Sequence, residues 1–167
     1  MSTKKDKFSI KDKFFMDLAL DLARSREGLT GTNPSVGCVI VKHDKIISVG
    51  QTSLKGRPHA EVNAINNSVE DLNDATMYVT LEPCSHHGLT PPCTNSIIRS
   101  KLKEVIYSVT DIDQRVKGKT YKILKSKKIK VKTGLLKEKA KQFYAPYFFN
   151  RKNTLPYVCL LYTSDAA

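Results

Sequence analysis

The chain has 167 residues, of which 40% are hydrophobic, and its 28 Lys and Arg against 16 Asp and Glu give a formal net charge of +12. This length suits one globular domain with a sizeable core and excludes two ordinary domains. No apolar run approaches the roughly 18 residues of a membrane span, and the N-terminus lacks the apolar centre of a signal peptide. We therefore expect no membrane partner and a cytoplasmic location.

The basic residues and the four cysteines exclude two further classes of protein. Lysines recur at both ends and along 117–141, without the interleaved aromatic residues that stack on bases, so we interpret them as a solvated surface and do not expect nucleic acid as a partner. The cysteines are unevenly spaced, which argues against a disulfide framework and favours metal ligands or buried thiols.

The N-terminal third of the chain predicts a helix and then a hairpin. Apolar residues at helical spacing predict the helix between Asp12 and Glu27, and Gly28 lies where it would stop. Two runs rich in β-forming residues, 36–42 and 46–52, predict antiparallel strands joined by a short turn.

The remaining elements alternate between helix and strand. A second helix is expected from Pro58 to about Asn67, because proline is favoured in a first helical turn. The later elements are a strand at 76–81, a helix at 94–100, a strand at 104–109, a helix at 119–126, a strand at 129–133 and a helix at 135–149. This alternation predicts a three-layer α/β/α fold with helices on both faces of a central mixed sheet.

A histidine, a glutamate and two cysteines lie in a pattern that suits a catalytic metal. His59-Ala60-Glu61 is followed by Glu82-Pro83-Cys84, and Cys93 lies nine residues further along. A catalytic zinc takes three protein ligands and keeps one position open for water, and a histidine with two cysteines supplies such a set. Helix N-termini at these positions would favour thiolate over thiol.

Glu61 has a separate use in the same site. Zinc lowers the pKa of a bound water toward about 7. A carboxylate two residues from a ligand histidine can face this water, take its proton and deliver it to a leaving amine. The alternatives are that His59 caps a helix and that the cysteines are buried thiols or ligands of a structural zinc, with His86 or His87 as a fourth ligand. Glu61 and the two Pro-Cys pairs favour the catalytic interpretation.

These motifs resemble a known family. His59-Ala60-Glu61, the run 78–88 (YVTLEPCSHHG) and Thr90-Pro91-Pro92-Cys93 are similar to the deaminase domains of the riboflavin-biosynthesis deaminase/reductases, which are related in fold to cytidine deaminases. The eight residues between the two cysteines are typical of the riboflavin branch. The resemblance covers about Phe14 to Tyr157 and implies a cytidine-deaminase-like fold with zinc as the metal.

The resemblance also implies a substrate and its contacts. It implies hydrolytic deamination of 2,5-diamino-6-ribosylamino-4(3H)-pyrimidinone 5′-phosphate to the 5-amino-uracil compound and ammonia. Asn33 and His86 match family positions that contact the pyrimidine or the ribose, and Asp111, Asp113 and Arg115 lie in the segment expected to close over the ribosyl phosphate. Taken alone, Asn33 before a proline is equally good as a turn residue.

Two departures from the family pattern concern the phosphate. Leu89 stands where relatives usually carry a basic residue, and the segment 111–115 (DIDQR) replaces the more usual Asp-Pro-Asn-Pro. Because a guanidinium suits phosphate, we expect Arg115 to replace the charge absent at Leu89.

The C-terminus departs as well. Residues 155–158 resemble the start of the first strand of a reductase domain, and 159–167 do not continue it. We therefore expect a flexible tail at 1–10, the deaminase domain at 11–150, and at 151–167 a linker with a truncated reductase start or an unrelated tail. The oligomeric state is open, with a homo-oligomer among the expected forms.

Two rival functions stay open at this point. One is another deaminase of the same fold, acting on cytosine nucleosides or on adenosine in transfer RNA. The other is a zinc-stabilised nucleic-acid-binding module that uses the basic surface, which predicts salt-sensitive binding and no role for Glu61.

Overall fold

A five-stranded sheet forms the centre of the protein in the computed structural model, which describes residues 8–153 and 157–158. The strand order is β2-β1-β3-β4-β5. The strands are β1 (Gly37–Lys42), β2 (Lys45–Gln51), β3 (Thr76–Leu81), β4 (Glu104–Val109) and β5 (Lys130–Thr133). Strand β1 runs antiparallel to both β2 and β3, whereas β3, β4 and β5 are parallel to one another. The predicted mixed sheet is thus confirmed.

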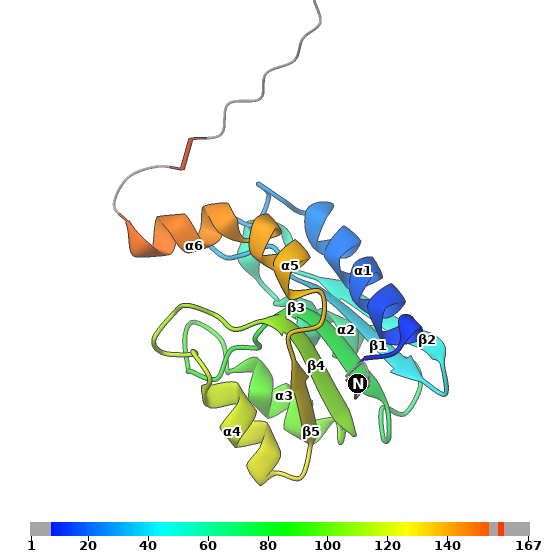
Figure 1. The fold of residues 1–167 in the computed structure, drawn as a ribbon. Helices are drawn as coiled ribbons and strands as arrows, with labels where there is room; N and C mark the ends of the chain where they lie inside the picture. Colours follow the sequence, from blue (N-terminus) through cyan, green and yellow to red (C-terminus); the bar gives the residue numbers. More distant parts are fainter. Residues whose placement is uncertain (1–7, 154–156, 159–167) are drawn as a thin grey trace, which may run out of the picture.

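Helices cover both faces of the sheet, as expected (Figure 1). The helices are α1 (Ile10–Arg24), α2 (Ala60–Asn66), α3 (Cys93–Arg99), α4 (Lys119–Ser126), α5 (Lys137–Phe143) and α6 (Ala145–Lys152), with a short 3-10 turn at Leu54–Gly56. Helices α1 and α5 pack on one face, and α2, α3 and α4 pack on the other. None of the helices in the described residues is long and apolar enough to span a membrane.

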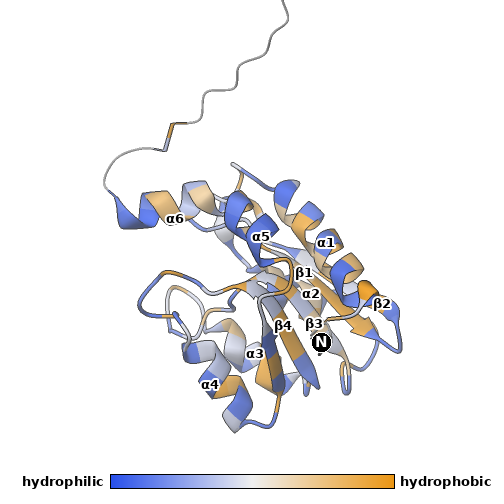
Figure 2. Ribbon diagram, in the orientation of Figure 1, coloured by the Kyte–Doolittle hydropathy of each residue, from blue (hydrophilic) through white to orange (hydrophobic). Residues whose placement is uncertain are grey.

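The central strands are apolar on both faces, because each face is covered by helices. Val39 and Val41 of β1 pack in a cluster with Phe15 of α1, whereas Cys38 and Ile40 point to the opposite cluster. Figure 2 shows the resulting hydrophobic colouring along the central strands. The thiol of Cys38 is fully buried in this core, where it packs as a small apolar side chain.

The first helix begins earlier than predicted. Ser9 is its N-cap, and a capping box joins the Asp12 backbone N–H to Ser9 Oγ (3.1 Å) and the Ser9 N–H to Asp12 Oδ2 (2.7 Å). Because this pair satisfies N–H groups left free at the helix start, the helix extends to Ile10, which the sequence had placed in the tail. Its last residue is Arg24, ahead of Gly28. Residues 1–7 of the expected tail lie outside the described part of the chain.

The second helix begins later than predicted, at Ala60 instead of Pro58. His59 is the N-cap residue and has an extended backbone (φ −72°, ψ 159°). The carbonyl of Pro58 accepts a hydrogen bond from the Ser53 N–H (3.1 Å), and the carbonyl of His59 is the first to accept within the helix, from Asn63 (3.0 Å). The proline thus lies in the connection, and the histidine at the helix N-terminus.

The predicted helix at 135–149 is two helices, α5 and α6, with Tyr144 between them. Pro146 has no N–H to donate to the carbonyl of Gln142, and its ring would collide with that carbonyl in a continuous helix. The Tyr144 hydroxyl is buried at the break, where it donates to the Ser35 carbonyl (2.9 Å) and shares a hydrogen bond with Thr80 Oγ1 (2.6 Å). Of the expected reductase-like start, only Tyr157 and Val158 are described; both are exposed and outside any strand.

Gly50 of β2 is a point of close contact between sheet and helix. A methyl group on its Cα would overlap backbone atoms of Ala60 and Ala64, with the Ala64 Cα at 2.9 Å. We expect Gly50→Ala to lower the free energy of unfolding by about 1–3 kcal/mol through overpacking. Urea denaturation measures this change, and Gly88→Ala, whose new methyl would meet nothing closer than 3.8 Å, is the control. Equal stability of the two variants would contradict the prediction.

Candidate active site

The candidate residues meet at one edge of the sheet. Strands β2, β3 and β4 all end there, and β1, which is antiparallel to β3, begins there. The segments that follow or precede these strands carry His59, Cys84, Asp111 and Asn33, and all four line one cavity of about 370 Å³. Ligand sites in open α/β sheets lie at the carboxyl ends of the strands, as this cavity does.

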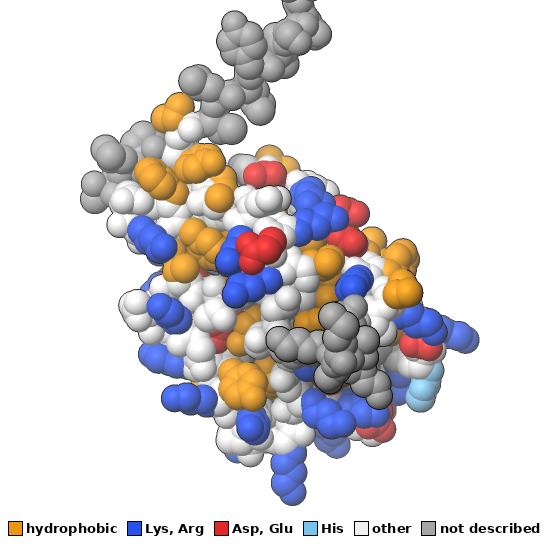
Figure 3. Space-filling model, in the orientation of Figure 1, with side chains coloured by type: hydrophobic (Ala, Val, Ile, Leu, Met, Phe, Trp, Pro, Cys, Tyr) orange, Lys and Arg blue, Asp and Glu red, His pale blue; other side chains and the backbone are white. Residues whose placement is uncertain are grey.

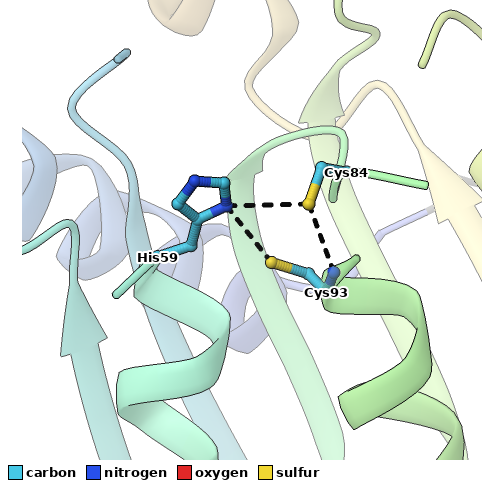
Figure 4. Close-up of side chains that lie close together, drawn as sticks. All are labelled: His59, Cys84 and Cys93. Atoms are coloured by element: carbon cyan, nitrogen blue, oxygen red, sulfur yellow. Dashed lines mark hydrogen bonds between the residues drawn. The ribbon is translucent and has the colours of Figure 1, made fainter. Parts of the chain in front are cut away.

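His59, Cys84 and Cys93 form a compact group of metal-ligating atoms beside this cavity (Figure 4). His59 Nδ1 lies 3.6 Å from Cys84 Sγ and 3.3 Å from Cys93 Sγ. A tetrahedral zinc with bonds of about 2.0–2.3 Å separates its ligand atoms by about 3.5 Å, so the group fits such an ion. His59 precedes α2 and Cys93 begins α3, which places both ligands at helix N-termini.

Hydrogen bonding between Cys84 and Cys93 gives the two thiols different pKa values. The Cys93 N–H donates to Cys84 Sγ (3.2 Å). Hydrogen bonding from Cys93 lowers the pKa of the Cys84 thiol to about 4, and the same contact raises the pKa of Cys93 well above its usual value. The hydrogen bond to Cys84 raises the pKa of His59. One sulfur is thus held as thiolate, the form that binds metals.

Glu61 lies in the first turn of α2 and faces the same cavity. Its side chain is 3% exposed. Burial raises its pKa to about 7, against the opposing effect of the His59 charge. A carboxyl group with this pKa can both accept and donate a proton at neutral pH.

Two residues expected to contact the substrate ring line the cavity. The Asn33 amide donates to the Gly56 carbonyl (3.1 Å), which fixes the side chain at the cavity wall. His86 has a buried Nδ1 without a hydrogen-bond partner among the described residues. Such an atom is costly to leave unpaired in a folded protein.

Asp111, Asp113 and Arg115 of the segment 111–115 also form part of the cavity wall. Asp111 is buried and accepts hydrogen bonds from the Asp113 N–H (3.0 Å) and the Tyr147 hydroxyl (3.4 Å). The guanidinium of Arg115 is already paired, with Nη2 at 2.6 Å from Asp113 Oδ2 and Nε at 3.0 Å from Oδ1. This pair holds the pKa of Asp113 well below its usual range. All three residues thus lie at the cavity, but the charge of Arg115 is balanced internally.

Comparison with known proteins identifies the family. Residues 9–109 match the cytidine and deoxycytidylate deaminase zinc-binding region. The chain belongs to the cytidine and deoxycytidylate deaminase family. This deaminase is 42% identical, over 88% of its chain, to the whole length of a diaminohydroxyphosphoribosylamino-pyrimidine deaminase of Buchnera aphidicola subsp. Schizaphis graminum.

Other relatives of the deaminase are longer. The riboflavin biosynthesis protein RibD of Aquifex aeolicus is 43% identical over 89% of this chain, which spans 42% of that protein. A solved structure of Acinetobacter baumannii RibD superposes with a TM-score of 0.79 at 39% identity, covering 83% of this chain and 39% of the other. The deaminase therefore spans about two fifths of these relatives.

Glu82 is a buried residue of the site whose role the sequence did not reveal. Its carboxylate accepts hydrogen bonds from the backbone N–H groups of Asp111 (3.3 Å), Gly118 (3.0 Å) and Thr120 (3.3 Å). The Thr120 hydroxyl also donates to the Pro83 carbonyl (2.6 Å). Glu82 thus joins the end of β3 to the segment that carries the 111–115 wall, and we infer that it positions that wall.

The variant Glu82→Gln tests this positioning role. A glutamine would turn an amide N–H group toward backbone N–H donors, which leaves buried donors unpaired. We expect the free energy of unfolding to fall by about 1–3 kcal/mol and KM to rise about tenfold. Amide hydrogen exchange in 111–120 should accelerate, whereas Glu138→Gln, at an exposed site, should not change it. Unchanged exchange in Glu82→Gln would contradict the role.

Three more cavity residues were missed from the sequence: Arg57, Tyr147 and Arg151. Arg57 precedes the ligand histidine by two residues, so its nearness to the motif was a usable signal. Tyr147 lies in the predicted helix 135–149, whereas Arg151 lies in the segment 151–167 that was predicted as a linker or tail; both residues belong to α6. Only the break at Tyr144 turns this helix toward the cavity.

Proposed function

We propose that this deaminase removes an amino group from 2,5-diamino-6-ribosylamino-4(3H)-pyrimidinone 5′-phosphate by hydrolysis, giving the 5-amino-uracil compound and ammonia. The observation that carries the proposal is the group His59, Cys84 and Cys93 beside the buried Glu61 at a cavity that also holds His86. The names of the similar proteins from Buchnera and Aquifex support the choice of substrate and a place in riboflavin biosynthesis. A cytoplasmic location stays a prediction.

We infer that zinc is the metal, held by His59, Cys84 and Cys93. The donor set supports this choice, since one nitrogen and two sulfurs at these separations suit zinc better than they suit magnesium or calcium, which prefer oxygen. When bound, the metal would supply a Lewis acid that lowers the pKa of a coordinated water. Three protein ligands would leave one coordination position of the metal for water.

The chain's own groups would then move the protons and hold the ring. Glu61 would take a proton from the attacking water as the new carbon–oxygen bond forms, and would deliver a proton to the amino group that leaves as ammonia. The imidazole of His86 and the fixed amide of Asn33 would orient the pyrimidine or the ribose. The buried Asp111 and its neighbour Asp113 offer acceptors for hydroxyl groups of the sugar.

The test is ammonia release from the proposed substrate by the zinc-loaded protein. Cytidine, deoxycytidylate and transfer RNA are assayed beside it. We expect turnover of the diaminopyrimidine ribosyl phosphate at a kcat/KM at least about 100-fold above the others, a difference of about 2.7 kcal/mol. Preferential turnover of cytidine or of adenosine in transfer RNA would assign the protein to the rival deaminase activity.

The face of the molecule drawn in Figure 3 does not support the rival nucleic-acid-binding module. Lys and Arg side chains are spread over the face seen in Figure 3, with acidic and apolar side chains between them. A nucleic-acid site usually gathers its cations on one face or along one groove. Family membership also gives Glu61 a chemical use that this rival lacks.

A further inference from the structure

The cavity is lined by three arginines that differ in how their charge is balanced. Arg115 is paired with Asp113 through both Nε and Nη2. Arg151 lies over the ring of Tyr147, with its guanidinium carbon 5.6 Å from the ring centre. Burial raises the pKa of Asp111 and the Arg115 guanidinium lowers the pKa of Asp113, and the charge of Arg151 has a smaller lowering effect on both. Both of these arginines thus lie on the acidic wall of the cavity.

Arg57 has a neutral partner, which lies on the loop between the two ligand cysteines. Its Nη1 donates to Thr90 Oγ1 (2.7 Å), and its Nη2 lies near Gly88, where an added methyl would meet it at 3.8 Å. Within the described part of the chain, Arg57 forms no ion pair with a carboxylate. Arg57 precedes the ligand His59 by two residues and lines the same cavity.

The contact between Arg57 and Thr90 leaves donors available. Arg57 uses Nη1 for Thr90, so its other N–H groups are free to form a bidentate contact. Thr90 Oγ1 accepts from Arg57, so the threonine O–H can donate to a further group. Leu89, between Gly88 and Thr90, is 89% exposed and brings no charge. Two adjacent donors, one of them cationic, at a cavity wall without a carboxylate partner suit an anion.

We propose that Arg57, with the Thr90 hydroxyl as a second donor, binds the phosphate of the substrate. This proposal rests on the proposed function, and it assigns to Arg57 the contact that the sequence had assigned to Arg115. The planar guanidinium matches a phosphate through two parallel hydrogen bonds, whereas the guanidinium of Arg115 is engaged in the same kind of contact with Asp113.

The test compares substrates with and without the phosphate. KM and kcat are measured for the ribosyl phosphate and for the corresponding riboside, using wild type, Arg57→Gln, Arg115→Gln and Arg99→Gln. Arg99 is the matched control, because its guanidinium also donates to a hydroxyl (Ser96, 3.3 Å) but lies outside the cavity. For Arg57→Gln we expect KM to rise about 10- to 100-fold with the phosphate and less than about threefold with the riboside.

Two outcomes would overturn the proposal. An equal rise in KM for both substrates would show that Arg57 stabilises the loop that carries Thr90 and does not bind the phosphate. If KM rises selectively for the phosphate substrate in Arg115→Gln but not in Arg57→Gln, Arg115 is the residue that binds the phosphate.

A binding measurement separates this proposal from the proposed function. Titration of the protein with ribose 5-phosphate and with ribose, followed by NMR, reports phosphate recognition without turnover. Wild type should bind ribose 5-phosphate at least about tenfold more tightly than ribose, and Arg57→Gln should lose this preference. If the wild type deaminates neither form of the substrate but shows this pattern, the proposed substrate fails and the phosphate contact stands. Equal preference in wild type and Arg57→Gln would reject the contact.

Discussion

Glu61→Gln is expected to lower kcat by about 10²–10⁴-fold while the fold and the metal content stay unchanged. Glu61 is the carboxyl group that lines the cavity from the first turn of α2, two residues after the ligand His59. An amide has nearly the same volume, so the helix and its packing should persist. It cannot accept a proton from water or carry one to the leaving amine. KM should change little, because the proton transfers belong to the chemical step.

Three measurements on the same preparations check this expectation. Ammonia release gives kcat, metal analysis gives zinc per chain, and thermal unfolding reports the fold. Glu70→Gln is the control, since Glu70 is exposed and does not line the cavity. A near wild-type kcat for Glu61→Gln would show that Glu61 does not transfer the proton. Loss of both zinc and activity in Glu61→Gln would show instead that Glu61 is needed for metal binding.

Local sequence signals located the elements of the fold well, and the errors have local causes. Strands β3 and β4 and helix α4 match their predicted ranges, because each apolar run is bounded by turn residues or charged residues. The break at Tyr144 was foreseeable, since Pro146 cannot continue a helix. The early start of α1 was also foreseeable, because Ser9 and Asp12 have the spacing of a capping box. The later start of α2 was not, because it accompanies a hydrogen bond from the Ser53 N–H to the Pro58 carbonyl across the 3-10 turn at Leu54–Gly56.

The candidate site was predictable to the extent that its chemistry lies in short motifs. His59, Glu61, Cys84 and Cys93 stand out because metal ligation and proton transfer demand particular residue types at close spacing. The support from Glu82 could not be predicted, since it consists of hydrogen bonds to backbone N–H groups, which any residue can supply. The balance of charge between Arg57 and Arg115 was equally hidden, because it depends on which carboxylate the folded chain brings to each guanidinium.

Cys93→Ala is expected to abolish zinc binding and turnover together. Cys93 begins α3, is 1% exposed, and places its Sγ 3.3 Å from His59 Nδ1. Two remaining ligands cannot close the site around a zinc ion, since catalytic sites rely on three protein ligands. The backbone N–H that donates to Cys84 stays in place in this variant, so the arrangement of Cys84 should survive.

Zinc content and zinc-dependent stability test this expectation. Zinc that binds only the folded state at 100 times its Kd stabilises that state by about 2.7 kcal/mol, so wild type should melt higher with zinc than after chelation. Cys93→Ala should show no such rise. Cys38→Ala is the matched control: its thiol is fully buried in the core and does not belong to the metal group, so the variant should lose stability and keep zinc. One zinc bound per chain of Cys93→Ala would mean that another residue completes the site, and Cys93 would then be a buried thiol at a helix start.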